Sequence, residues 1–349
     1  MAPQSKTGSS RYKRNKPLGF LGVVISAAML ACALPFLSKG GDRGFVGTSV
    51  LSVGKELSAQ AALIKSKALT EVFEMPKVYT LQWNTDPVPV PNPECFEGEN
   101  YYKDETIEVK VWDERIANSD VHFAEVWIQH PTQIRSAWAG RIVGSGKVAN
   151  PVRIADDINA LIAINCDYAG YRTTGYIIRQ NQVYRPGPYG YLDTLLIDSN
   201  GDFHLMPDYQ VEKSGILDEY QITNSYSFGP SLILDGEPVK DLSRTACEEE
   251  KWNILCPRTA IGQLGPLHYL LCVVDGELPG TPGVTIYRMR EIMMEKGCIQ
   301  AYNFDGSASS TMIFGGRTVN APMWGANVQR SMYDILYFAT AVPDHEIGN

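Results

Sequence analysis

The sequence predicts an α+β fold, in which a mixed, strand-rich sheet domain with few helices follows an N-terminal transmembrane helix. Three observations lead to this fold class. The 349 residues include 18 Tyr and 31 Gly, which favour strands and turns over a helix bundle. Short segments after residue 100 alternate apolar and polar residues with a period of two. One later segment, 285–297, has helical spacing with capping residues at both ends.

Composition and charge limit the classes of function. Apolar residues make up 44% of the chain and charged residues 20%, which is typical of a globular protein long enough for one large domain or two modest ones. The formal net charge is −8 and the isoelectric point is near 5.3. Nucleic acid is therefore not expected as a partner, because a polyphosphate backbone requires clustered cations. A single phosphate group is still compatible with this charge.

The N-terminus has the pattern of a membrane anchor. A basic tail, 1–17, precedes 18–37, which contains no charged residue and would span about 30 Å as a helix. The basic flank predicts a cytoplasmic N-terminus, a single pass through the cell membrane and an extracellular C-terminal domain. A cleaved signal peptide is the alternative, since 31–33 resemble a cleavage site. The apolar run exceeds a usual signal core and favours the uncleaved anchor.

A stem and linker are predicted between the anchor and the folded domain. Residues 42–75 show weak helical periodicity, and 84–100 contain four prolines, which exclude a helix or a central strand. We therefore assign 38–100 to the stem and linker, and 101–349 to the extracellular domain.

Two local structures are predicted inside that domain. Residues 106–112 alternate as a strand, and 122–130 follow as the partner strand. Thr285 is a suitable N-cap for a helix, and Gly297 is a suitable C-terminal stop. The apolar face of this helix would consist of Ile286, Met289, Ile292 and Met293.

Three strand-length apolar runs, 160–168, 268–277 and 298–306, have polar endings. These endings are, in order, Asn165 with Asp167, Asp275, and Asn303 with Asp305. One Asp after a strand is usually a turn residue, but three similar endings suggest a site. The last two runs flank the predicted helix, so their ends would be neighbours at one sheet edge if the strands run parallel. Ligands bind at the carboxyl ends of such strands.

Four motifs in order resemble the phosphodiester glycosidase domain of the uncovering-enzyme type. They are AINCDYAGYRTTGYIIRQNQVYR (163–185), SFGPSLILDGE (227–237), PRTAIGQLGPLHYLLCVVDG (257–276) and AYNFDGSASSTMIFGGRTVN (301–320). The resemblance extends over about 101–338, and the family also includes exported bacterial proteins of exopolysaccharide biosynthesis. It implies a mixed α+β fold and a hydrolase acting on a carbohydrate phosphodiester in cell-surface or cell-wall glycans.

The chemistry of that reaction suggests roles for individual residues. A phosphate monoester leaves with little protonation, so the site mainly needs a carboxylate at the anomeric carbon and cations around the phosphate. Asp305 and Asp167 are the first candidates for the catalytic nucleophile or base, and Asp275 is the third. Arg258 is the first candidate for the phosphate, because its fork can bind two oxygens. Further substrate-binding candidates are Asn165, Arg172, Asn303, Gly306, Ser309, Ser310 and Arg330.

Tyrosines and metal ions are further considerations. Tyr168, Tyr171 and Tyr176 are candidates for stacking on a sugar ring, although Tyr176 is better explained as sheet surface. No cofactor is required by this reaction, and no residue is assigned as a metal ligand. Ca²⁺ or Mg²⁺ at clustered aspartates is an alternative, because both ions prefer oxygen ligands.

The sequence departs from the family pattern in two loops. The family reads Asn-Leu-Asp-Gly-Gly-Gly-Ser-Ser, whereas this chain has Ser307 and Ala308 in place of two glycines, and Cys166 stands where the family carries Gly. If 307 and 308 require positive φ, each substitution costs about 1 kcal/mol. A non-catalytic glycan-binding or scaffold module of surface polysaccharide biosynthesis is therefore the alternative function. A wall transferase for phosphodiester-linked glycans is a third.

Overall fold

The computed structural model describes residues 78–242, 254–323 and 329–343. The chain divides between Met75 and Pro76, and every described element belongs to the second unit. The predicted tail and anchor, 1–17 and 18–37, lie outside the described residues. Among the residues that are described, no helix combines the length and apolar character needed to cross a membrane.

The described strands form a nine-stranded sheet, a five-stranded sheet, a three-stranded sheet and a hairpin, with antiparallel pairing throughout. The large sheet, in spatial order, consists of β1 (Phe96–Glu97), β2 (Tyr101–Lys103), β3 (Ile107–Ile116), β4 (Ser119–Ile128), β15 (His268–Val274), β14 (Arg258–Gly265), β16 (Gln300–Asn303), β12 (Ser231–Leu234) and β13 (Glu237–Pro238). The five-stranded sheet consists of β18 (Arg317–Thr318), β17 (Met312–Phe314), β6 (Ile162–Asn165), β19 (Asp334–Phe338) and β5 (Ile134–Trp138).

The smaller elements complete the domain. The three-stranded sheet consists of β10 (Phe203–Pro207), β9 (Asp193–Asp198) and β11 (Ile222–Phe228), and the hairpin of β7 (Ile177–Arg179) and β8 (Gln182–Arg185). The described α-helices are α3 (Pro151–Asp157), α4 (Val211–Ser214), α5 (Ile216–Glu219) and α6 (Ile286–Glu295). The predicted strand-rich domain with few helices is therefore confirmed.

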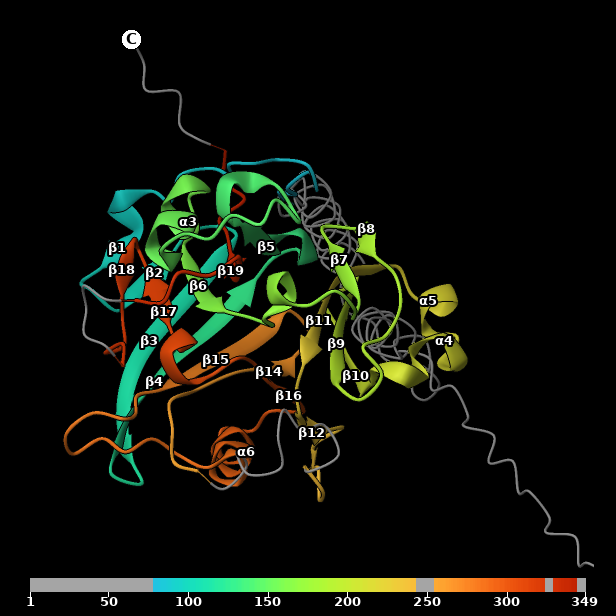
Figure 1. Ribbon diagram of the computed structural model, residues 1–349. Helices are drawn as coiled ribbons and strands as arrows, with labels where there is room; N and C mark the ends of the chain where they lie inside the picture. Colours follow the sequence, from blue (N-terminus) through green and yellow to red (C-terminus); the bar gives the residue numbers. More distant parts are fainter. Residues whose placement is uncertain (1–77, 243–253, 324–328, 344–349) are drawn as a thin grey trace, which may run out of the picture. The chain divides into compact units, whose positions relative to one another are not determined.

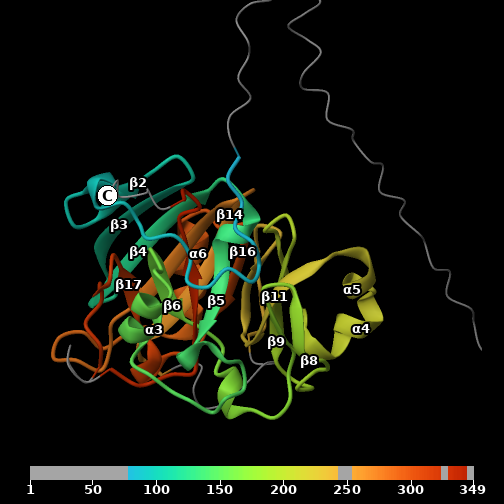
Figure 2. The same ribbon diagram turned by 90° about the horizontal axis from the view of Figure 1, so that it is seen from above.

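Alternation along the strands arranges these elements in layers. On β15, Leu271 and Val273 face the core between the nine- and five-stranded sheets, whereas Leu270 and Cys272 face α6. On β6, Ile164 faces the same central core, whereas its neighbour Ala163 faces α3. The layer order is thus α6, nine-stranded sheet, five-stranded sheet and α3, as seen in Figure 1. In the view from above, Figure 2, these layers overlap, and α4, α5, β9 and β11 lie to one side of them.

The predicted hairpin and helix are both present. Strands β3 and β4 pair along their full length. Helix α6 begins after Thr285, whose hydroxyl accepts a hydrogen bond from the Arg288 N–H at 3.1 Å. Gly297 has φ of 82°, as expected for a C-terminal stop. The predicted apolar face is buried against the large sheet, and its members are Ile286, Met289, Ile292 and Met293.

The Pro-rich segment 84–100 differs from the prediction, because it packs on the domain. Val88 is buried, and its carbonyl accepts a hydrogen bond from the Asn159 side chain. The fully buried Arg135 donates to the carbonyls of Trp83 and Thr85. Proline prevents a regular ladder here, but side-chain donors satisfy the backbone instead. The folded unit therefore begins before the predicted boundary at Tyr101.

Strands β15 and β16 end at the same sheet edge, but they are not neighbours. Strand β14 lies between them and is antiparallel to both, with Arg258 opposite Val274 and Ala260 opposite Asn303. The first residue of β14, Arg258, is therefore at the edge where the other two strands end. The intervening strand separates Asp275 from Asp305.

Candidate active site

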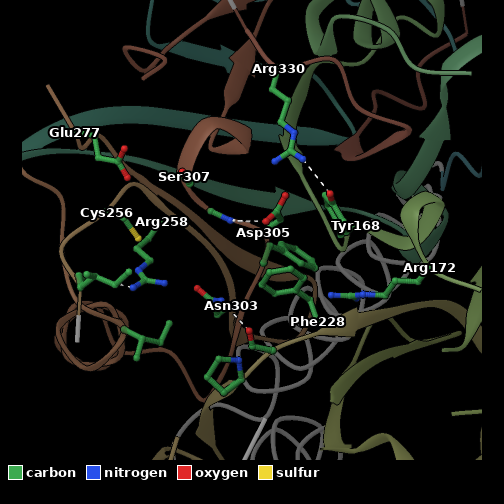
Figure 3. A pocket seen from close by; sticks show the side chains of 16 residues that line it. Tyr168, Arg172, Phe228, Cys256, Arg258, Glu277, Asn303, Asp305, Ser307 and Arg330 are labelled. Carbon is green, nitrogen blue, oxygen red and sulfur yellow. Dashed lines mark hydrogen bonds between the residues drawn. The ribbon is translucent and has the colours of Figure 1, made fainter. Parts of the chain in front are cut away.

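A cavity of about 500 Å³ opens at this edge. The residues that line it come from the ends of β11, β14 and β16, from the start of α6 and from the segments that connect these and neighbouring elements. Figure 3 shows Asp305 near the centre of the charged side chains. The other charged residues of its described lining are Arg172, Arg258, Glu277 and Arg330. Three guanidinium groups and two carboxylates give this lining an excess of positive charge.

Two glycines bring the strand ends together. A Cβ at Gly276 would lie 2.6 Å from the Pro257 nitrogen, and one at Gly306 would lie 2.7 Å from the Pro257 carbonyl oxygen. Each distance is too short for a side chain, so both Asp-Gly turns require glycine to pack on Pro257. The Ser307 N–H also donates to the Pro257 carbonyl at 2.9 Å. These contacts fix the position of Asp305 relative to Arg258, the residue that follows Pro257 in the chain.

Asp305 is a partly exposed carboxylate held by short polar contacts. Its Oδ1 accepts from the Gly306 N–H at 3.1 Å, and its carboxylate also bonds the Ser309 hydroxyl. Burial raises the pKa of Asp305, while the Ser309 hydroxyl and the positive charge of Arg330 oppose this rise. The carboxylate thus combines low solvation with access to the cavity, as a nucleophile or base requires.

Arg172 and Arg258 are oriented by backbone carbonyls. Arg172 donates to the Ser227 carbonyl, and its guanidinium lies 5.2 Å from the ring centre of Phe228. Arg258 donates through Nε to the Val284 carbonyl at 3.2 Å. Burial lowers the pKa of Arg258, although a guanidinium keeps its charge in proteins. Both arginines line the cavity, where their positive charge suits an anionic ligand.

Arg330 is held above two stacked tyrosines. Its guanidinium donates to the Tyr168 hydroxyl at 3.0 Å and to Ser309 Oγ at 3.3 Å. The Tyr168 and Tyr171 rings are stacked 4.0 Å apart. Of the three predicted stacking residues, Tyr168 lines the cavity, Tyr171 lines a small adjoining pocket, and Tyr176 is buried in a separate apolar cluster.

Asp167 does not line the cavity, although the sequence suggested it as a nucleophile or base. It is fully buried, and its carboxylate pairs with Arg179 at 3.0 Å and accepts from the Ser227 N–H at 2.8 Å. Arg179 comes from β7 and also pairs with Asp334 at 3.0 Å. Burial raises the pKa of Asp334 to about 6, partly offset by Arg179. The strand ending predicted the carboxylate but not this internal partner.

The buried cluster around Arg179 is also relevant to the alternative in which aspartates bind a metal ion. Asp167, Asp334 and Cys166 have ligand atoms within 4.8 Å of one another. The Arg179 guanidinium already provides the cation among them. The three predicted aspartates are not gathered around one point, so they do not form the oxygen-rich site that Ca²⁺ or Mg²⁺ would need.

Asp275 lines a different cavity, together with His122. Its carboxylate lies 3.0 Å from His122 Nε2 and accepts from the Ala321 N–H at 3.1 Å and the Asn320 amide at 3.2 Å. His122 Nδ1 lies 2.7 Å from Asp113. Asp275 therefore anchors the 320–321 segment and does not contact the cavity of Asp305.

The predicted asparagines differ in their roles. Asn165 is buried, donates to the Asp305 carbonyl at 2.6 Å and accepts from Thr259 Oγ1 at 2.8 Å, so it positions the Asp305 turn. Asn303 lines the cavity and donates to the Gly229 carbonyl at 2.8 Å. Its Oδ1 is buried without a hydrogen-bond partner among the described residues. Asn303 is thus the better candidate for a substrate contact.

The remaining predicted contacts are also divided. Gly306 lines the cavity, and Ser309 reaches it indirectly through Asp305 and Arg330. Ser310 is buried and does not line the cavity. Glu277 also lines the cavity, but the sequence pattern did not indicate it; its φ of 58° places it in the left-handed region two residues after Asp275. Phe228 and Pro230 line the cavity too, and they were not predicted although they lie within the motif 227–237.

Ser307 confirms one of the two predicted sites of backbone strain. Its φ is 54°, whereas Ala308 is absent from the residues with positive φ. We expect Ser307→Gly to raise the free energy of unfolding by up to about 1 kcal/mol, because glycine removes the left-handed strain but adds freedom to the unfolded chain. Urea unfolding measures this change. Ala308→Gly is the matched control and should be neutral or destabilising; equal stabilisation by both would contradict this interpretation.

Comparison with known proteins identifies the class. The family model described as phosphodiester glycosidase matches residues 158–339, just over half of the chain. The chain belongs to the phosphodiester glycosidase family. The match includes Asp305, Arg172, Arg258 and Arg330, the residues gathered around the cavity.

Individual relatives are distant. The SPbeta prophage-derived uncharacterized protein YomE of Bacillus subtilis (strain 168) is 28% identical over 187 residues, which cover 51% of this chain and 27% of that protein. The chain thus spans about a quarter of the length of this curated relative. The zebrafish N-acetylglucosamine-1-phosphodiester alpha-N-acetylglucosaminidase catalytic domain, auto-inhibited by its pro-peptide, has a TM-score of 0.55 at 16% identity and covers 76% of this chain and 97% of that one. A hypothetical protein from Synechocystis has a TM-score of 0.49 at 14% identity, with 67% and 62% covered. The zebrafish likeness shows the fold alone.

Proposed function

We propose that this chain hydrolyses the bond between the anomeric carbon of a sugar and the phosphate of a phosphodiester. The observation that supports this most strongly is the arrangement of the Asp305 cavity, where one partly exposed but weakly solvated carboxylate shares its walls with three arginines. A phosphodiester carries one negative charge, and its departing phosphate monoester gains a second near neutral pH. Arginines that stabilise this developing charge accelerate the reaction.

The cavity suggests a role for each group. Arg258 and Arg172 bind the phosphate oxygens, and Asn303 Oδ1 accepts a hydrogen bond from a sugar hydroxyl. Asp305 either attacks the anomeric carbon or takes the proton of the attacking water. The carbon–oxygen bond then breaks, and its electron pair leaves on the phosphate oxygen. Glu277 is the second carboxylate in the described lining and can serve as the partner that activates or delivers water.

The cellular setting is also part of the proposal. The uncharged run 18–37 after a basic tail supports a single-pass anchor with the catalytic domain outside the cell. A substrate in cell-surface glycans fits this location.

A pair of model compounds tests the proposed reaction. The full-length chain is incubated with the methyl phosphodiester of N-acetylglucosamine-1-phosphate and, separately, with methyl N-acetylglucosaminide, which lacks the phosphate. Free sugar should appear from the first compound at least about a hundredfold faster, because only the phosphodiester engages the arginines. Equal rates would contradict the assignment of the arginines. Saturable binding without release would support the non-catalytic glycan-binding module.

The pH dependence of activity should report the environment of Asp305. Its ionised form is the active one, so kcat/KM should fall as the pH decreases through a pKa that burial places above the usual range of an aspartate. Arg330→Met removes a positive charge that lowers this pKa, so the acidic limb should move to higher pH. Arg288→Met, at the surface of α6, is the control and should leave the limb unchanged. If Arg330→Met leaves the acidic limb unchanged, the limb does not report the protonation of Asp305.

A further inference from the structure

Another cavity, of about 310 Å³, lies between β5, the hairpin β7–β8 and the 83–86 segment. We propose that it is an additional binding site for a neutral sugar ring, separate from the catalytic cavity. It combines aromatic rings and side-chain amides, the two groups that sugar rings require. The residues that carry the proposal are Trp83, Asn84, Trp138, Gln180, Gln182 and Tyr184.

The walls of this cavity are fixed by buried hydrogen bonds. Arg135 is fully buried and holds the segment that carries Trp83, donating to the Trp83 carbonyl at 3.0 Å and the Thr85 carbonyl at 2.9 Å. The Gln180 side chain accepts from the Ser136 N–H at 3.2 Å and donates to the Ser136 carbonyl at 2.8 Å. These bonds join the hairpin to β5. The site is therefore largely formed before a ligand arrives, which reduces the entropy lost on binding.

One buried donor in the lining lacks a partner. The Trp138 side chain is 5% exposed, and its indole N–H has no hydrogen-bond partner among the described residues. A buried donor without a partner is unfavourable, so a ligand hydroxyl that pairs with this N–H would strengthen binding. Trp138 lines the cavity, and a sugar hydroxyl is an acceptor of suitable size.

The charges and rings of the lining favour a neutral, polar ligand. Asp86 carries the negative charge and Arg141 a positive one, while Arg179 is paired with Asp167 and Asp334. Trp83 and the 43% exposed Tyr184 offer apolar ring faces with polar tips. Such faces match the C–H face of a sugar ring, and the amides of Gln182 and Asn84 both donate and accept hydrogen bonds.

The ion-paired cluster separates this cavity from the catalytic one. Arg179 lines the proposed sugar cavity and also pairs with Asp167, which accepts from the Ser227 N–H. The Ser227 carbonyl in turn accepts from Arg172 of the catalytic cavity. A polymer bound at both places would be held at two points on the domain, so affinity for a long glycan would exceed that for a single ring.

Tryptophan indole signals test the proposal directly. The full-length chain, labelled with ¹⁵N-tryptophan, is titrated separately with glucose, galactose, mannose and N-acetylglucosamine up to 100 mM. Trp83→Phe and Trp138→Phe assign the two signals of the cavity. At least one sugar should shift both signals saturably. Tyr184→Ala should lower the affinity for that sugar about fivefold, which is the effect of losing one ring contact.

A matched control and the contrary outcome make the test decisive. Tyr209 is exposed to a similar extent, 46%, and is not part of the cavity, so Tyr209→Ala should leave the affinity unchanged. The proposal is overturned if none of the four sugars moves the Trp83 and Trp138 signals. It is also overturned if Tyr184→Ala and Tyr209→Ala have the same effect. Neither outcome depends on catalytic turnover, so the proposed hydrolysis is tested independently.

Discussion

Asp305→Asn should reduce kcat for sugar release from the phosphodiester by about a thousandfold. Asparagine keeps the size of the side chain and can retain the contact with the Gly306 N–H. It removes the negative charge that attacks the anomeric carbon or stabilises the positive charge developing there. Because the arginines remain in place, KM should change much less than kcat. Steady-state kinetics with the methyl phosphodiester measures both parameters.

Two comparisons sharpen this prediction. Glu277→Gln should lower kcat by a smaller factor, because Glu277 is exposed and has the secondary role. Asp167→Asn, by contrast, should act mainly on stability, since Asp167 does not line the cavity. If Asp305→Asn keeps more than a tenth of the activity, another group must carry the chemistry. A larger loss with Glu277→Gln would reverse the two assignments.

Arg179→Met should lower the free energy of unfolding by about 3–5 kcal/mol, because it leaves two buried carboxylates without their cation. Asp167 and Asp334 each lie 3.0 Å from Arg179, and all three side chains are almost completely buried. Burial raises the pKa of Asp334 to about 6 even beside Arg179, and loss of the guanidinium raises this pKa further, so Asp334 can bind a proton at pH 5 but is charged at pH 8. The loss of stability should therefore be larger at pH 8 than at pH 5. Urea unfolding at the two pH values measures the difference.

The exposed ion pair of Arg153 provides the matched control. Arg153 pairs with Asp157 at 2.9 Å, but its side chain is 74% exposed. Arg153→Met should change the free energy of unfolding by less than about 1 kcal/mol at either pH. A similar loss in both variants would show that burial of the Arg179 cluster does not increase its contribution to the free energy of unfolding. A loss independent of pH would argue against titration of Asp334.

Local sequence patterns were sufficient for the strands, the main helix and the edge that carries the site. Period-two alternation identified the β3–β4 hairpin, and Thr285 with the apolar face identified α6. The polar ending of the apolar run 298–306 located Asn303 and Asp305 at the cavity. These features depend on neighbouring residues in the chain, and therefore leave a direct signal in it.

Long-range partners could not be predicted in the same way. Asp167 and Asp305 both follow apolar strands, but only the folded chain brings Arg179 to one and leaves the other facing a cavity. Strand β14 between β15 and β16 likewise separates Asp275 from Asp305. Similarly, the prolines of 84–100 suggested a linker because the sequence gives no sign that Arg135 binds the carbonyls of this region. Such pairings depend on topology, which local periodicity does not determine.

Hydrolysis in ¹⁸O-labelled water tests the central claim most directly. Water that attacks the anomeric carbon, directly or through a covalent intermediate with Asp305, places the label in the sugar. Water that attacks phosphorus places it in the phosphate. Mass spectrometry of the products from the methyl phosphodiester should find ¹⁸O in N-acetylglucosamine and none in methyl phosphate. Label in methyl phosphate, or in N-acetylglucosamine phosphate with release of methanol, would contradict the proposed glycosidase reaction.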